Sequence, residues 1–336
     1  MNTIKAVVSR RAGAGTEVLE IADVDAPARP GPGQVTIEVT SFPVHPGDLQ
    51  AVAAARPDSA GPVIAGAEAT GVVVEAGPGV ALTAGMRVTT FLIDGAWRQQ
   101  ITVDADRVVA VPDLLSDQVA AQMLINPVTV LMLRRAAQQH VSVGFDGVVL
   151  NNAAASAVGR LFTAGSAHHQ IATISIVRSD DRADQLKQLF PEVPVISTQA
   201  PDWPDRIRAA AGGRPIPVAL DPIGGVGSGD LLSLLSPGGS LVVYGLMAPE
   251  AIPLHAATLV HHDLALRGLN IGRWPLAPVE QRRSDLASAT AIAQGLSAHF
   301  DVAAWYPLEE IRAAAAHVDR PGKVGTVLVT MDGTSR

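Results

Sequence analysis

The sequence contains no cysteine among its 336 residues. This absence excludes disulfide bonds, a thiolate nucleophile and every zinc site built on sulfur, so packing alone must hold the fold. Any metal would depend on histidine and carboxylate ligands. Two adjacent histidine pairs are present, His168-His169 and His261-His262, but neighbouring side chains on one helix or strand point apart. We expect no bound metal.

Long apolar runs and blocks of like charge are also missing. No segment reaches roughly 18 uninterrupted apolar residues, the length that a membrane-spanning helix needs. The net charge of −7 is spread along the chain, which argues against a nucleic-acid surface or a membrane anchor and favours a small-molecule partner. The first residues alternate polar and apolar side chains, unlike a signal peptide, so we expect a cytoplasmic protein.

The length and the hydrophobic patterning predict an α/β protein of two domains. The N-terminal part has short strands separated by Gly and Pro, typical of a small β-barrel, at residues 5–9, 34–40, 70–75 and 87–91. Ser116 can then cap a helix that holds Val119, Ala120, Met123 and Leu124, and a second helix is expected over residues 128–139.

Long helices alternate with compact apolar strands in the next part of the chain. These strands indicate a doubly wound parallel sheet and are expected at residues 147–150, 171–177, 218–220, 240–244 and 264–269. A helix at 284–294, a segment at 305–308 and a helix at 309–317 follow, and a last strand at 324–330 could return to the barrel. We expect domain boundaries at 1–125, 126–272 and 273–336.

The loop 152–159 follows the first of these strands and leads into a helix. Of the three-glycine dinucleotide fingerprint it keeps only Gly159, with Ala153 and Ser156 at the earlier small positions, so an ordinary strand-to-helix turn remains an alternative. The next strand ends at Arg178-Ser179, nineteen residues after Gly159. Arg and Ser suit a 2′-phosphate where an NAD site would have Asp or Glu, so NADPH is favoured over NADH. Arg178 could also be a solvated charge.

Further segments carry a resemblance to a known family. They are residues 45–50 (HPGDLQ), Gly66-Ala67-Glu68 with Gly71, residues 94–98 (DGAWR), 125–129 (INPVT), the loop 152–159, 221–225 (DPIGG), 237–239 (PGG), 244–247 (YGLM) and 263–268 (DLALRG) with Arg273-Trp274. In order and spacing the chain resembles the zinc-free branch of the medium-chain dehydrogenase/reductase superfamily, and most closely its mitochondrial-type 2-enoyl thioester reductases and quinone oxidoreductases.

The resemblance implies a GroES-like β-barrel domain joined to a Rossmann domain, with NADPH in the cleft between them. It places Asn126 and Thr129 beside the nicotinamide ribose and the catalytic centre. It further implies a homodimer joined through the edge strand 264–269. The remaining cofactor-binding residues that it implies are Ala155, Ser156, Ala157, Val158 and Gly159 at the pyrophosphate, Arg178, Ser179 and Asp180 at the 2′-phosphate, and Tyr244, Gly245, Leu246, Met247, Leu269, Asn270, Ile271 and Lys323.

Two departures from the relatives bear on the chemistry. Zinc-dependent members have a histidine ligand where this chain has Ala67, and His45 alone cannot build a zinc site. Enoyl thioester reductases have a proton-donating tyrosine at the position that aligns with Arg56, whereas the tyrosines here are Tyr244 and Tyr306. The candidate replacements are His45 as an acid and Arg56 as an electrostatic stabiliser, although Arg56 could equally be a solvent-facing charge.

The sequence therefore favours a zinc-independent NADPH-dependent reductase of an activated C=C bond in an enoyl thioester or enone. NADPH:quinone reduction is an alternative, because a quinone needs no protonation at carbon. An NADPH-binding protein without catalytic activity is a third reading, from a different class.

Overall fold

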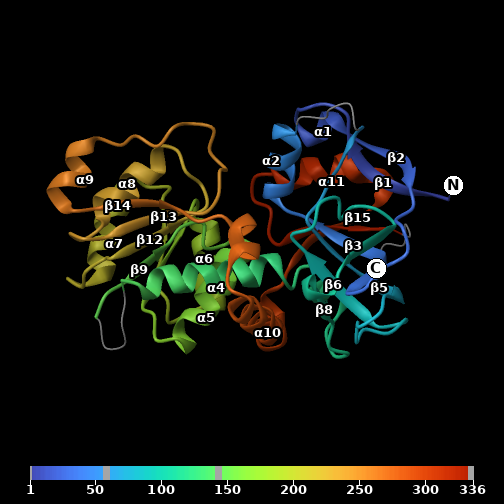
Figure 1. The fold of residues 1–336 in the computed structure, drawn as a ribbon. Coiled ribbons are helices and arrows are strands. Elements are labelled where there is room, and N and C mark those ends of the chain that lie inside the picture. Colours follow the sequence, from blue (N-terminus) through green and yellow to red (C-terminus); the bar gives the residue numbers. More distant parts are fainter. Residues whose placement is uncertain (1, 56–60, 141–145, 332–336) are drawn as a thin grey trace. The chain divides into compact units, whose positions relative to one another are not determined.

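The computed structural model describes residues 2–55, 61–140 and 146–331. It divides into two compact units (Figure 1). The first unit comprises Met1–Pro127 and Ala277–Arg336, and the second comprises Val128–Leu276. Within the described residues, no helix combines the length and the apolar character that a bilayer crossing requires.

The first unit is built from two β-sheets. A three-stranded sheet has the order β2 (Leu19–Asp25), β1 (Thr3–Ser9), β4 (Val63–Ile64). The larger sheet runs β15 (Val302–Pro307), β16 (Thr326–Thr330), β3 (Gln34–Val44), β5 (Glu68–Ala76), β6 (Arg87–Phe91), β8 (Val108–Ala110), and β7 (Gln100–Asp104) also pairs with β3.

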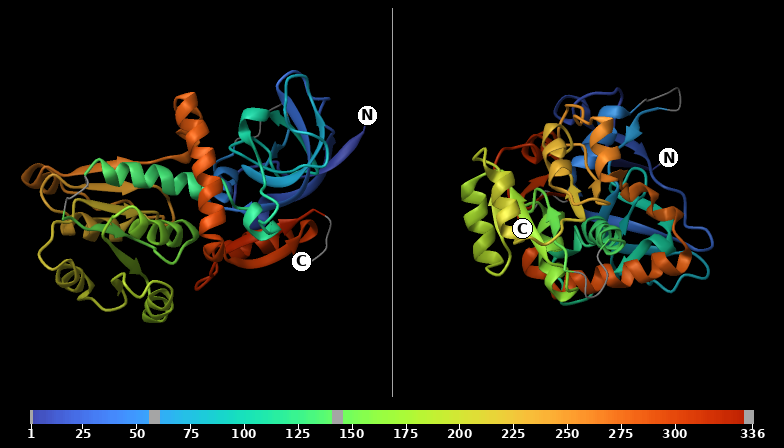
Figure 2. Two further views of the ribbon diagram at one scale, coloured as in Figure 1. Left: turned by 90° about the horizontal axis from the view of Figure 1, so that it is seen from below. Right: turned by 90° about the vertical axis from the view of Figure 1, so that its left-hand side faces the viewer.

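The C-terminal strand returns to the N-terminal part of the chain. β16 pairs antiparallel with β3, with Thr330 opposite Ser41, which confirms the predicted return of the last strand. β15 and β16 lie side by side and parallel, in red in Figure 2. The helices of this unit are α1 (Gly15–Val18), α2 (Pro46–Ala54), α3 (Asp117–Ala120), α10 (Val279–Gly295) and α11 (Ile311–Val318).

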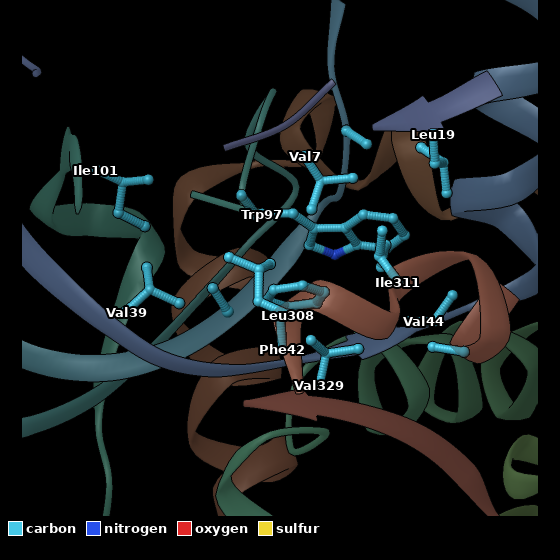
Figure 3. Packing of buried hydrophobic residues seen from close by; sticks show 14 of the residues in the cluster. Val7, Leu19, Val39, Phe42, Val44, Trp97, Ile101, Leu308, Ile311 and Val329 are labelled. Atoms are coloured by element: carbon cyan, nitrogen blue, oxygen red, sulfur yellow. The ribbon is translucent and has the colours of Figure 1, made fainter. Parts of the chain in front are cut away.

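Trp97 lies at the centre of the core of the first unit (Figure 3). Its ring stacks on Phe42 with 5.0 Å between centroids, and Leu308 and Ile311 pack around the pair. Gly66 is required beside this indole, because its φ is +90° and an added Cβ would lie 2.0 Å from the Trp97 ring. The core therefore fixes the chain just before β5, where Glu68 begins the strand.

The second unit contains a six-stranded, wholly parallel sheet. Its order is β11 (Val195–Ser197), β10 (Thr173–Val177), β9 (Val149–Asn151), β12 (Val218–Asp221), β13 (Ser240–Val243), β14 (Ala265–Gly268). Figure 1 shows β9, β12, β13 and β14 in this order. The direction of chain progression reverses between β9 and β12, and doubly wound sheets bind nucleotides at such a switch point, beyond the carboxyl ends of the strands.

Helices cover the parallel sheet through separate apolar clusters. α6 (Asp180–Leu189) packs on β10 and β11 through Ala183 and Leu186. α7 (Trp203–Ala211) and α8 (Val226–Leu234) contribute Ile207, Leu231 and Leu232 to another cluster. The other helices of this unit are α5 (Ala157–His168), α9 (Ala256–His262) and the greater part of α4 (Ile125–Gln138), which begins in the first unit.

The helix predicted after Ser116 is shorter than expected. Ser116 caps it as predicted, but α3 ends at Ala120 and leaves out Met123 and Leu124. The Leu124 N–H donates to the Glu68 carboxylate and not to a carbonyl of α3. The next helix, α4, starts at Ile125, before the expected residue 128. A contact distant in sequence thus decides where both helices lie.

Candidate active site

The carboxyl ends of the parallel strands bring together most of the predicted nucleotide-binding residues. Asn152 follows β9, Arg178 follows β10, Tyr244 follows β13 and Leu269 follows β14. All these positions lie in the second unit. Their common location follows from the parallel sheet, whose strands all end at one edge.

The loop from Asn152 to Ser156 turns sharply into α5. Ala153 has a φ of +50°, a conformation that non-glycine residues seldom adopt outside functional turns. Ser156 caps α5, because its side chain accepts the Gly159 N–H at 3.1 Å. An added Cβ at Gly159 would lie 2.7 Å from the Ala153 carbonyl oxygen, so the helix lies directly against the loop. Ser156 is exposed and the first helical residues, Ala157 and Val158, are half-buried, and this close packing at a helix N-terminus suits a pyrophosphate.

Asp221 organises the centre of this edge, a role that the sequence did not identify. The residue is fully buried. One carboxylate oxygen accepts from the Asn152 side chain and the Ile223 N–H, both at 2.9 Å. The other accepts from the Gly224 N–H at 3.2 Å and from the Ser228 hydroxyl at 2.5 Å. Asp221 therefore ties β9, β12 and the start of α8 together.

The segment after β13 combines a buried hydroxyl with an exposed apolar tip. The Tyr244 hydroxyl is buried and has no hydrogen-bond partner within the described chain. Burial, and then the charge of Asp221, raise the pKa of Tyr244. Gly245 packs against the Pro222 carbonyl, while Leu246 and Met247 are exposed. A buried hydroxyl without a partner in the described chain, next to the exposed Leu246 and Met247, is suited to contact a bound dinucleotide.

The predicted 2′-phosphate site lies at the start of α6. Arg178 and Asp180 are exposed and Ser179 is half-buried. Ser179 is the N-cap residue of α6, and its side chain makes no capping hydrogen bond to the helix. After β14, Leu269 and Ile271 are half-buried, and the exposed Asn270 side chain accepts the Gly272 N–H at 2.8 Å.

The first unit holds a buried imidazole and carboxylate pair. His45 Nε2 lies 2.8 Å from Glu68 Oε2, and the Glu68 side chain is fully buried. Burial alone would lower the pKa of His45, but the hydrogen bond and charge of Glu68, together with the charge of Asp48, raise it above its usual value. Sequence reasoning named His45 and missed Glu68, although Glu68 stands in the quoted Gly66-Ala67-Glu68 segment.

Asp48 and Lys323 complete the surroundings of His45. The Asp48 carboxylate accepts the His45 backbone N–H at 2.9 Å. Burial raises the pKa of Asp48 to about 6, against the opposing influence of His45. The charge of Lys323 opposes protonation of His45, and its ammonium group donates to the Gly325 carbonyl at 2.8 Å. The structure therefore brings two predicted residues, His45 and Lys323, into one charged group.

Asn126 and Thr129 are both buried in the first turns of α4. They are three residues apart, so their side chains share one face of the helix. Arg56 lies outside the described residues. Among the described residues, no group of three or more His, Asp or Glu side chains is arranged to hold a metal ion.

Two known protein families match separate segments of this chain. The family described as alcohol dehydrogenase GroES-like domain matches residues 31–113, and the family described as zinc-binding dehydrogenase matches residues 157–288. The chain is 32% identical over 340 aligned positions to a 2-haloacrylate reductase of Burkholderia sp, covering 96% of this chain and 98% of the relative. It is 29% identical over 284 positions to a mitochondrial enoyl-acyl-carrier-protein reductase of Caenorhabditis elegans, covering 80% and 79%.

Solved structures share the fold over the whole chain. An Escherichia coli quinone oxidoreductase complexed with NADPH has a TM-score of 0.84 at 22% identity, with 97% of this chain and 99% of that chain covered. The chain belongs to the medium-chain dehydrogenase/reductase superfamily and is an oxidoreductase of that class. The predicted fold class, a GroES-like domain with a Rossmann domain, is thereby confirmed.

Proposed function

We propose that this protein is an NADPH-dependent, zinc-independent reductase of an activated C=C bond. The observation that carries the proposal is the buried pair of His45 and Glu68, a proton source in a domain whose described residues offer no metal site. The full-length similarity to a 2-haloacrylate reductase supports the same reaction type. Small acrylates, enones and short enoyl thioesters are the substrate classes to test first.

The residues of the second unit are suited to hold NADPH. The start of α5, from Ala155 to Gly159, would bind the pyrophosphate. Arg178, Ser179 and Asp180 would surround the 2′-phosphate. The Tyr244 hydroxyl would find in the dinucleotide the partner that it lacks in the chain. The loop Tyr244, Gly245, Leu246 and Met247 and the segment Leu269, Asn270 and Ile271 complete the proposed set in this unit. Lys323, which belongs to the first unit, stays a predicted cofactor residue.

Reduction of a C=C bond needs a hydride and a proton. NADPH, when bound, supplies the hydride to the β-carbon. We assign the proton to His45, because its raised pKa favours the imidazolium form. Asn126 and Thr129 are proposed to hold the reacting groups from one face of α4, and Arg56 is kept as a candidate stabiliser of the oxyanion.

The proposal is tested by following NADPH oxidation with a 2-haloacrylate, an enone, a short enoyl-CoA and a quinone. His45→Asn replaces the imidazole by an amide, and Asn cannot release a proton. We expect it to lower alkene turnover by about 10²–10⁴-fold, the usual contribution of a general acid. Wild-type protein that oxidises NADPH with none of the four acceptors would refute the reductase assignment.

Quinone reduction is the second candidate, and the absence of a tyrosine from the aligned position favours it. A quinone is protonated on oxygen, so loss of a carbon acid matters less. If quinone turnover were fast and unchanged in His45→Asn, while no alkene were reduced, the quinone would be the substrate. Tight NADPH binding without turnover of any acceptor would indicate the catalytically inactive binding protein.

We further propose a homodimer joined through β14. This strand ends the order of the six-stranded sheet, and all four of its residues are exposed. Unpaired edge strands of this kind are templates for pairing with a second chain. Light scattering should give twice the chain mass of 34.7 kDa. A monomeric mass at micromolar concentration would contradict the dimer.

A further inference from the structure

The Glu68 carboxylate makes two kinds of contact at once. Its Oε2 lies 2.8 Å from His45 Nε2. Its Oε1 accepts the backbone N–H groups of Leu124 at 2.9 Å and of Ile125 at 3.2 Å. Since Ile125 is the first residue of α4, this oxygen binds the start of the helix that carries Asn126.

The surroundings make Glu68 a fixed part of the first unit. Its side chain is fully buried, and a buried carboxylate is tolerated only when it is paired and hydrogen-bonded. The preceding turn is held by Gly66, which has space for no side chain beside Trp97. Any movement of this carboxylate would therefore disturb either His45 or the first turn of α4.

We propose that Glu68 is a positioning residue of the reductase, which orients the His45 imidazole for proton delivery with one oxygen and fixes the start of α4 with the other. This inference rests on the proposed function. Glu68 itself is not assigned a contact with substrate. It acts through His45 and through the backbone of α4.

The direction of the hydrogen bond decides which proton His45 can release. A carboxylate only accepts, so Nε2 carries the proton that binds Glu68. In the imidazolium the second proton is on Nδ1, which must then give up the capping contact in which it accepts the Asp48 backbone N–H. Once the hydride has reached the β-carbon, the Nδ1–H bond breaks, a C–H bond forms at the α-carbon, and neutral His45 keeps its Nε2–H on Glu68. Solvent then returns the proton.

Charges from three elements act on this titration. Glu68 on β5 and Asp48 on α2 favour the charged imidazole, whereas Lys323, from the loop before β16, disfavours it. A competing possibility is a purely structural histidine, because the imidazole also forms a capping box with the Asp48 backbone N–H at the start of α2. Such a histidine would stay neutral at Nδ1 throughout the working pH range.

Glu68→Gln separates these possibilities. The glutamine oxygen can still accept from Leu124 and Ile125, but its amide then donates toward His45, so Nε2 must become the acceptor and the imidazole must change tautomer. With the negative charge gone, we expect the pKa of His45 to fall, because the carboxylate that favours the charged imidazole is lost. Glu38→Gln is the matched control, since Glu38 is exposed on the neighbouring strand β3.

The measurement is a ¹⁵N titration of histidine-labelled protein, with His45 assigned by the signal missing from His45→Asn. Wild type and Glu38→Gln should show a protonated Nε2 in the neutral form, whereas Glu68→Gln should show a protonated Nδ1. The alkaline limb of kcat/KM for the alkene should shift to lower pH in Glu68→Gln by the same amount as the His45 titration. Glu68→Asp, which retains the charge, should recover part of both shifts.

Two outcomes would overturn the inference. One is an unchanged tautomer and pKa of His45 in Glu68→Gln. The other is a wild-type His45 that stays neutral from about pH 5 to about pH 9. This second outcome needs no variant, so it would refute the inference even if Glu68→Gln did not fold. If the wild type reduced no alkene while the titration behaved as expected, the proposed function would fall and the orienting contact between Glu68 and His45 would stand.

Discussion

Gly159→Ala tests whether the loop 152–159 binds the nucleotide, because it adds one methyl group where α5 packs against the loop. The new Cβ would lie 2.7 Å from the Ala153 carbonyl oxygen and from the Ala154 Cα, and these are backbone atoms that cannot rotate away. Reaching an ordinary contact of 3.4 Å requires the loop or the helix to move by about 0.7 Å. Overpacking of this kind lowers the free energy of unfolding by about 1–3 kcal/mol. The higher helix propensity of Ala offsets up to ~1 kcal/mol of this loss.

The same shift should weaken NADPH binding, because the displaced loop and the α5 N-terminus are the proposed pyrophosphate site. We expect the Kd to rise at least about tenfold, equivalent to ~1.4 kcal/mol. Binding is measured by titration calorimetry and stability by urea unfolding.

Gly165→Ala provides the control for this prediction, since it lies in the same helix with nothing within 4 Å of the added Cβ. It should leave the Kd unchanged and stabilise the protein by about 0.5–1 kcal/mol. If Gly159→Ala bound NADPH as well as Gly165→Ala and were no less stable, the loop would not be the binding site.

Two further substitutions test the charges. Arg178→Ala should raise the Kd for NADPH by about 10–100-fold, the contribution of a charge-assisted hydrogen bond, with little change in the Kd for NADH. Arg206→Ala on α7 is the control. Equal losses of affinity for both cofactors would contradict the assignment of Arg178 to the 2′-phosphate. Asp48→Asn should change how stability depends on pH, because burial raises the pKa of Asp48 from 3.8 to about 6 and ionisation then costs the folded state about 3 kcal/mol. The wild type loses this stability as pH rises from about 4 to 6, whereas the variant should not; parallel urea stabilities of the two proteins at both pH values would contradict the prediction.

The sequence was sufficient to predict the elements that bury their own apolar residues. Five of the six strands of the parallel sheet were predicted from their apolar runs, and four of these five are mostly buried, whereas β14 is exposed along its whole length. β11 was missed because its apolar run is only Val195 and Ile196, directly after Pro194, whereas the equally short β9 belongs to the longer run Val148, Val149 and Leu150. Two apolar residues give no pattern that could be distinguished from a loop.

The polar contacts of the site could not be predicted in the same way. Glu68 binds Leu124 across 56 positions, and Asn152 binds Asp221 across 69. Neither pairing leaves a local pattern, since each depends on which strands become neighbours. The one sign of these contacts in the sequence was an acidic residue at one end of a buried strand. Where no basic residue is next to it in the sequence, such an Asp or Glu must find hydrogen-bond donors elsewhere in the fold.

The pairing of His45 with Glu68 also explains why activity alone cannot establish what His45 does. Removing His45 leaves the buried Glu68 carboxylate with the Leu124 and Ile125 N–H groups as its hydrogen-bond donors among the described residues, and uncompensated buried charges are strongly destabilising. His45→Asn could therefore lose activity through displacement of α4 as well as through loss of a proton. The two causes differ in their pH dependence: a displaced helix lowers turnover equally at every pH, whereas a lost acid removes the limb that follows the His45 titration. Comparison of the pH profile with the ¹⁵N titration thus assigns the chemistry to the imidazole or to the helix.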